Sequence, residues 1–300
     1  MVNERYLKEK QIFISKINEL GGEAIAASAD NNDQLQIQQA NELISKGVKV
    51  LILNSINLNT AAAIVRNARS HGVKVIAYDR LIKNCDLDFF LSFDNEKVGK
   101  LMAEYVIKIK PSGKYMLLGG DKADQNAIWV KEGQKSALAT YINSGNIKII
   151  NDCYVEDWLG ENARFEVKRF IDLSGSVPDV ILSSYDGMST QVIDLLKEHN
   201  LAGQVLITGQ DAELPACRNI VKDYQVMTVY KPIKRLATSA AELAMKLAKN
   251  EKVTEINKAI NNGQVDVPTV LLDPIVVDKN NLKSTVIADG YQSEKEVYSN

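Results

Sequence analysis

Apolar and polar residues follow one another in blocks that are typical of strands and amphipathic helices in alternation. The first block predicts a helix over residues 4–20, which Gly21-Gly22 ends. Residues 23–29 have the composition of a strand, and residues 33–47 predict a second amphipathic helix, capped by Asp33. The chain therefore opens with a helix, a strand and a helix.

Eight further apolar runs predict strands, at residues 48–53, 73–80, 89–93, 114–118, 147–155, 180–183, 205–208 and 225–229. Helical patterns separate most of them, and Lys231-Pro232 opens a long helix to about residue 249. Strands that alternate with helices in two successive blocks favour parallel, doubly wound sheets. We therefore expect an α/β protein with two such domains, joined by a hinge of three segments.

The break at Pro111-Ser-Gly113 separates the two blocks, and the helix after Pro232 is expected to return to the first. The predicted N-terminal lobe comprises residues 1–110 and 231–265. The predicted C-terminal lobe comprises residues 111–230 and 266–300. The hinge is expected near residues 111–113, 230–232 and 264–268.

The stretch from Val73 to Arg80 is a short apolar run that stops at two charged residues, Asp79 and Arg80. In open α/β sheets ligands bind beyond the carboxyl ends of the strands, so both charges can face a small polar molecule. The alternative is a structural ion pair that closes the strand. The two residues alone do not distinguish these interpretations.

Five other side chains are predicted at the same ends of the strands: Asn126, Trp158, Tyr185, Asp211 and Lys231. Each has a simpler interpretation, such as a helix cap for Asn126, core packing for Trp158 or a turn for Asp211. Together they suit a neutral polyhydroxylated ligand, because each sugar hydroxyl both donates and accepts hydrogen bonds. The indole face of Trp158 matches the apolar face of a pyranose.

Composition limits the other functions. The net charge of −2 is spread without a basic patch, so nucleic acid and anionic membranes are not predicted partners. No apolar run approaches the ~18 residues of a spanning helix, and no apolar signal core follows Met1. We expect either a cytoplasmic protein or an exported one whose signal has been removed.

The motifs of enzymes and regulators are missing from the sequence. The two histidines, His71 and His199, are predicted at helix ends, and no Walker loop, nucleophile elbow or zinc spacing occurs. We therefore predict neither an enzyme nor a cofactor. A repressor with the same core would need a DNA-binding headpiece before Glu4, and none is present in the sequence.

Several long stretches resemble the periplasmic sugar-binding proteins of the type I fold, and within that family the members that bind D-xylose. The resembling stretches are KVIAYDRLI, FFLSFDNEKVGKL, GGDKADQNA, VEDWLGENA, GQDAEL, MTVYKPI and NNGQVDVPTVLLDPI. The resemblance implies that Asp79, Arg80, Asn126, Trp158, Asp211 and Lys231 contact the ligand. Tyr185 departs from the Asn that most members have at its position.

The resemblance also implies a partner and a location. The implied partner is a membrane permease of the ATP-driven importer type, or alternatively a membrane sensor histidine kinase, and the implied location is extracytoplasmic. Resembling proteins also have a first strand and a loop whose Arg contacts sugar, whereas this sequence starts at Met1-Val2-Asn3. That strand is central, so its absence would leave two unpaired edges. We expect that the sequence is trimmed or misassigned, that another segment fills the gap, or that binding is weakened.

Overall fold

The chain divides into two units, each assembled from segments that are distant in sequence. In the computed structural model, which describes residues 4–299, the first unit runs to Phe93 and also includes Ile233–Leu272. The second unit comprises Asp94–Pro232 and Asp273–Asn300. The chain thus passes between units three times, as predicted for a doubly wound pair.

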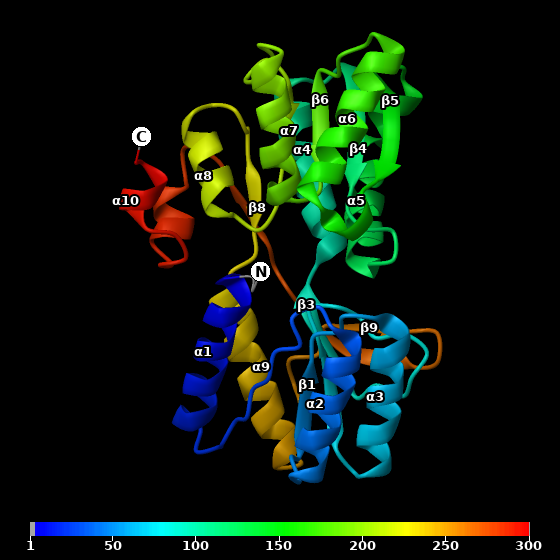
Figure 1. Ribbon diagram of the computed structural model, residues 1–300, viewed down its shortest axis with the longest axis vertical. Helices are drawn as coiled ribbons and strands as arrows, with labels where there is room; N and C mark the ends of the chain where they lie inside the picture. The colour runs from blue at the N-terminus through cyan, green and yellow to red at the C-terminus, as the bar shows by residue number, and fades with distance from the viewer. Residues whose placement is uncertain (1–3, 300) are drawn as a thin grey trace. The chain divides into compact units, whose positions relative to one another are not determined.

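The elements of the first unit are α1 (Glu4–Glu19), α2 (Asp33–Ser45), β1 (Val50–Leu53), α3 (Leu58–Ser70), β2 (Lys74–Tyr78), β3 (Phe89–Phe93), α9 (Ile233–Ala248), β9 (Lys258–Asn261) and β10 (Asp266–Leu272). Their sheet has the order β1-β2-β3-β10-β9, parallel except for the β10–β9 pair. Helices α1 and α9 lie side by side (Figure 1). Residues such as Ile76 and Leu91 in the strands and Leu236 in α9 form one buried apolar cluster.

The elements of the second unit are α4 (Asn95–Ile109), β4 (Gly113–Gly119), α5 (Gln125–Asn143), β5 (Ile147–Tyr154), the 3₁₀ turn η1 (Glu156–Trp158), α6 (Gly160–Ser174), β6 (Val180–Ser183), α7 (Asp186–Glu198), β7 (Leu206–Ile207), α8 (Leu214–Val221), β8 (Thr228–Tyr230), β11 (Ile275–Val277), the π-helix η2 (Lys283–Ile287) and α10 (Glu294–Val297). The main sheet is parallel with the order β5-β4-β6-β7, and β8 pairs antiparallel with β11. The α/β fold class with two parallel sheets is confirmed.

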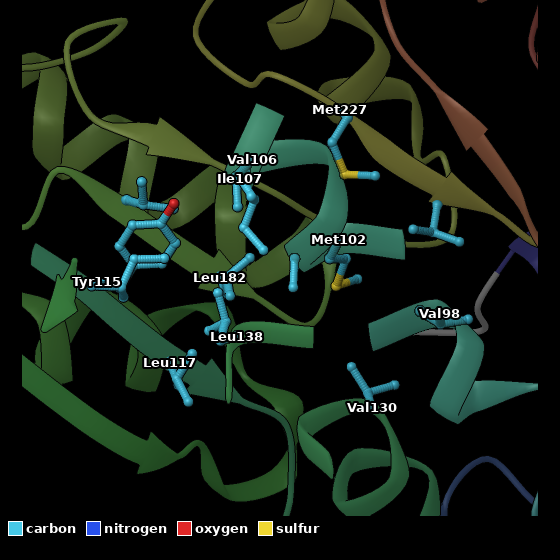
Figure 2. Packing of buried hydrophobic residues seen from close by; sticks show 14 residues of the cluster. Val98, Met102, Val106, Ile107, Tyr115, Leu117, Val130, Leu138, Leu182 and Met227 are labelled. Carbon is cyan, nitrogen blue, oxygen red and sulfur yellow. The ribbon is translucent and has the colours of Figure 1, made fainter. Parts of the chain in front are cut away.

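Apolar side chains from α4, α5 and the central strands form one buried core cluster of the second unit (Figure 2), and a second cluster involves α6 and α7. Met102, Tyr115, Leu117 and Val130 are fully buried there. Strands β4 and β6 read as continuous apolar runs because helices cover both faces of a parallel sheet.

The division between the units differs from the predicted boundaries at two elements. Helix α4 joins the second unit, where Gly99 and Gly133 allow it to lie against α5: a Cβ on Gly99 would come within 1.8 Å of the Val130 carbonyl oxygen. Strand β10 joins the first unit because it pairs with β3.

The start of α2 also differs from the prediction, since Asn32 rather than Asp33 caps this helix.

Residues 23–29 do not form the predicted strand. The backbone N–H groups of residues 23–28 make no hydrogen bond to another backbone group in the described part of the chain, and Ile25 is 50% exposed. In residues 4–299, β1 pairs with β2 and with no other strand, so this edge of the sheet is open. An apolar sequence forms a strand only where a neighbouring strand accepts its hydrogen bonds. Met1 to Asn3, where the sequence starts, lie outside the described residues.

Candidate functional site

Asp79 ends strand β2 in an unusual backbone conformation. Its φ is 66°, in the left-handed region that non-glycine residues seldom adopt. Strand β3 holds it there: the Asp79 N–H donates to the Leu91 carbonyl over 2.9 Å, and the Ser92 hydroxyl donates to the Asp79 carbonyl over 2.9 Å. The carboxylate is buried at the end of the strand, as predicted from the sequence.

Arg5 of α1, which the sequence analysis missed, reaches this carboxylate and also pairs with Glu9 of the same helix. The Arg5 Nη2 donates to Asp79 Oδ2 over 3.3 Å, and its Nε donates to Glu9 Oε1 over 2.8 Å. Burial raises the pKa of Glu9, which the neighbouring Arg5 guanidinium partly opposes. The spacing of Arg5 and Glu9, one helical turn apart on a buried face, was the available signal. The ion-pair interpretation of Asp79 is therefore correct in part, with Arg5 as its partner.

Arg80 extends toward the end of the neighbouring strand β1. Its Nη1 donates to the Ser55 carbonyl over 3.4 Å, a long bond. The Ser55 hydroxyl is buried and has no hydrogen-bond partner in the described part of the chain. Charged and hydroxyl groups thus gather at the carboxyl ends of β1 and β2.

Trp158 and Tyr185 meet in the second unit. Their rings pack edge to face with centroids 6.2 Å apart, and the indole lies over Gly120, where any Cβ would come within 2.2 Å of the ring. The Gly119-Gly120 pair at the end of β4 is therefore explained by packing. The indole N–H is buried without a partner among the residues described.

Tyr185 precedes α7, and its phenol donates to Glu213 Oε1 over 2.6 Å. Burial, with help from the Glu213 carboxylate, raises the pKa of Tyr185 far above its usual range, so the phenol keeps its proton. Because its single hydrogen goes to Glu213, the phenol oxygen can only accept bonds from a ligand.

Asp211 and Lys231 form an ion pair in the second unit. Lys231 Nζ lies 3.1 Å from Asp211 Oδ1, and the side chains are only 6% and 16% exposed, respectively. The angles do not meet those of a hydrogen bond, and this carboxylate oxygen has no other donor within residues 4–299. Asp211 has a φ of 90° and donates its N–H to the Val229 carbonyl. A buried acceptor is therefore available beside a cation.

Asn126 does not cap α5, because Asp124 occupies that position and accepts from the Asn126 N–H. The Asn126 side chain is buried instead, and its Oδ1 accepts from Asn95 Nδ2 over 3.0 Å. The amide–amide pair fixes how Asn126 points from the start of the helix.

Asp186 supports the loop that carries Asp211. Its carboxylate accepts from Gln225 Nε2 (2.8 Å), from the Thr228 hydroxyl (2.9 Å) and from the Glu213 N–H (3.1 Å). Complete burial raises the pKa of Asp186 well above its usual range, although the bonds from Gln225 and Thr228 oppose that shift.

Of the seven predicted residues, the first unit carries Asp79 and Arg80, and the second carries Asn126, Trp158, Tyr185, Asp211 and Lys231. Within the second unit, direct contacts join Trp158 to Tyr185 and Asp211 to Lys231. No cluster of three or more metal-ligating side chains occurs in the described part of the chain. The helices found in residues 4–299 include none that is long and apolar enough to cross a membrane.

The family described as the periplasmic binding protein domain matches residues 5–252. The match covers well over half of the chain, and the chain therefore belongs to this family. The family consists of binding proteins, which confirms the prediction of a binding protein rather than an enzyme.

The particular relatives bind a pentose. The D-xylose-binding periplasmic protein of Haemophilus influenzae is 42% identical over 295 residues, covering 98% of this chain and 89% of that protein. The Escherichia coli protein of the same name is 41% identical over 294 residues, with coverage of 98% and 89%. The resemblance predicted from the motifs is confirmed.

A solved structure has the same fold. It is an ABC transporter solute-binding protein from Clostridium phytofermentans with bound β-D-glucose, and it matches with a TM-score of 0.88 at 25% identity. The alignment covers 98% of this chain and 96% of that one.

Proposed function

We propose that the protein is an extracytoplasmic receptor that binds D-xylose or a similar monosaccharide and presents it to an ABC-type permease. The observation that carries the proposal is the buried Asp211–Lys231 pair, whose Asp211 Oδ1 lacks a hydrogen-bond donor in the described residues. The Lys231 ammonium, 3.1 Å away, balances the charge of this oxygen, but burial without an aligned hydrogen-bond donor is still costly until a donor arrives. A sugar hydroxyl supplies that donor, and its oxygen accepts from the Lys231 ammonium.

The aromatic pair suits the apolar part of the same ligand. The indole of Trp158 is half-buried and fixed by Gly120 and Tyr185. A flat ring held in this way offers an apolar face to the C–H groups of a sugar, and its free N–H offers a donor at the edge. In the proposal Trp158 stacks on the sugar, and the Tyr185 oxygen accepts one hydroxyl.

The polar groups of the first unit complete the proposed ligand set. Asp79 accepts, while Arg80 and Arg5 donate, so the three provide both kinds of hydrogen bond that a hydroxyl can make. Asn126 offers an amide. Each unit thus offers polar groups that suit the hydroxyls of a sugar.

Calorimetric titration with xylose, ribose, glucose and arabinose tests the ligand. We expect one sugar per chain, with xylose bound most tightly. The test variant is Asp211→Ala, and the matched control is Asp194→Ala, because Asp194 pairs with Lys197 over 2.9 Å on the exposed surface of α7. Asp211→Ala should lose most affinity and Asp194→Ala none. Absence of heat with all four sugars would overturn the proposal.

The partner is tested by reconstitution. The xylose-loaded protein should stimulate ATP hydrolysis by the cognate permease in liposomes, whereas the sugar-free protein should stimulate it less. If the loaded protein instead changes only the autophosphorylation of a sensor histidine kinase, the permease assignment is wrong and the sensor alternative replaces it.

A further inference from the structure

The residues Asp211 and Ala212 need support from their surroundings. Both have left-handed backbone, with φ of 90° and 52°, and neither is glycine. Such a conformation costs on the order of 1–3 kcal/mol per residue and persists only where neighbouring groups hold it. The Ala212 N–H donates to the Thr228 hydroxyl over 3.3 Å, a long bond that fixes one side of the turn.

The other side of the turn is held by a C-terminal segment, residues 289–292. The amide of Gln292 donates from Nε2 to the Ala212 carbonyl oxygen over 3.1 Å. The Cys217 thiol also approaches this oxygen, at 3.4 Å, but a thiol is a weak donor. Of these two side chains, Gln292 is thus the stronger hydrogen-bond donor to the Ala212 carbonyl oxygen.

The same segment holds the residue before Lys231. The Tyr230 phenol donates to Asp289 Oδ2 over 2.5 Å, and the Tyr230 ring stacks on Tyr291 with centroids 5.3 Å apart. Burial raises the pKa of Tyr230 far above its usual range, so the phenol remains a donor. The C-terminal segment therefore contacts both residues that adjoin the ion pair: Gln292 contacts Ala212, and Asp289 and Tyr291 contact Tyr230.

The segment itself is firmly anchored in the second unit. Leu282, Val286 and Val297 are buried on either side of it. The Arg218 guanidinium of α8 donates to the Glu296 carbonyl over 2.8 Å, which ties α10 to the helix that follows the Asp211 turn. The contacts of residues 289–292 thus belong to a rigid part of the fold.

We propose that residues 289–292 form a C-terminal clamp that positions Asp211 and Lys231 against each other for the ligand. Gln292, Asp289 and Tyr291 are positioning residues. They contact Ala212 and Tyr230, the neighbours of Asp211 and Lys231 in the chain. The proposal rests on the proposed function for its effect on sugar affinity, but its effect on the Asp211 turn does not depend on any ligand.

The central experiment replaces Gln292 by Met, which keeps the length of the side chain and removes the donor. The matched control is Gln204→Met, because Gln204 makes the same kind of bond to the Asn200 carbonyl over 2.8 Å, before β7 and at the opposite end of that strand from Asp211. We expect Gln292→Met to weaken xylose binding about three- to tenfold, as for the loss of one hydrogen bond. Gln204→Met should bind as the wild type does.

A double-mutant cycle separates positioning from general destabilisation. Asp211→Asn keeps one acceptor and should retain measurable binding. In that background Gln292→Met should cause little further loss, because it acts through the Asp211 turn. An equal loss in both backgrounds would overturn the clamp, since Gln292 would then act elsewhere. If Gln292→Met folds poorly, Tyr230→Phe is the second test variant, because it removes the bond from the phenol to Asp289. Its control is Tyr105→Phe, which removes a similar bond to the Asp278 carboxylate.

Hydrogen exchange on the sugar-free protein tests the clamp independently of the ligand. Gln292→Met should accelerate exchange at the Asp211 and Ala212 amides and leave α5 unchanged. If the wild type bound no sugar but this acceleration occurred, the proposed function would fail and the clamp would stand. Unchanged exchange at both amides in a folded Gln292→Met protein would overturn the clamp.

Discussion

Left-handed backbone recurs at the residues proposed to contact the ligand. Asp79, Trp158 and Asp211 have φ values of 66°, 57° and 90°. Each follows the carboxyl end of a strand or a tight turn, where the chain must change direction while a side chain is aimed outward. Asp tolerates this conformation better than most residues and Trp does not, but no pattern in the sequence marked any of the three positions. The residue types could be predicted as ligand contacts from the sequence, but the strain that aims them could not.

The substitution of Asp79 separates its two roles. Asp79→Ala should lower sugar affinity by roughly 10- to 150-fold, because ligand hydroxyls lose a charged acceptor. Asp79→Asn should lose less, since one acceptor remains. Both should also lower the melting temperature of the sugar-free protein, because the buried Arg5 loses one of its two carboxylate partners. Calorimetric titration and thermal unfolding measure the two effects.

The control for Asp79 is Glu9→Gln, which changes the other carboxylate bonded to Arg5. It should lower stability while sugar affinity changes far less than in Asp79→Ala. Wild-type affinity in folded Asp79→Ala would return Asp79 to a purely structural ion pair.

Asp186 gives a prediction of pH dependence. Its pKa in the folded protein is raised above the ordinary value of 3.8 by complete burial, so the unfolded chain ionises first as the pH rises. The contribution of Asp186 to the free energy of unfolding is therefore full below pH 3.8 and is lost above it, until the folded protein also ionises.

The variant Asp186→Asn isolates this contribution in urea unfolding at a series of pH values. The variant should be less stable than the wild type, because an amide replaces an acceptor of three hydrogen bonds. Its deficit should shrink as the pH rises above 3.8. A deficit that grows with pH would mean that the hydrogen bonds outweigh burial and lower the pKa of Asp186.

At the scale of elements, the pattern of apolar residues predicted the positions of most strands but not which strands pair with one another. Strands β2, β3, β4 and β6 lie where apolar runs predicted them, because a strand buried on both faces has little freedom to be anything else. Residues 23–29 have a similar composition but no neighbouring strand within residues 4–299, and a single sequence does not show which partner is present. Arg5 and Glu9 were missed for a related reason, since α1 reads as an ordinary amphipathic helix.

The open edge at β1 should be visible in hydrogen exchange. Amides of residues 24–28 should exchange nearly as fast as an unfolded peptide, because they donate to no backbone group in the described residues. The amides of β3, which lies between β2 and β10 in the same sheet, provide the internal control and should be strongly protected. Strong protection of residues 24–28 would mean that a strand partner occupies the edge in solution.

At the scale of the whole molecule, we propose that the three passages between units, at 93–94, 232–233 and 272–273, are the hinge. The predicted hinge segments agree with this at one passage, the one after Pro232. The other two passages differ from the predicted hinge segments because α4 packs on α5 and β10 pairs with β3. The order of the elements along the sequence does not reveal these contacts.

Small-angle scattering tests the hinge. Saturating xylose should reduce the radius of gyration, because a ligand of a hinged protein shifts the population toward a closed state. The Asp211→Ala variant, with its affinity reduced, should show no change at the same sugar concentration. An identical radius of gyration for the wild type with and without xylose would exclude closure as the response.

The placement of β10 between β3 and β9 also governs when the protein can fold during its synthesis. The ribosome makes β3 about 170 residues before it makes β10, so the nascent sheet of the first unit lacks an inner strand while that whole stretch is synthesised. The second unit likewise waits for β11 to pair with β8. Neither unit can be completed until β10 and β11 have emerged, a delay that keeps both units incompletely folded while the chain between is made.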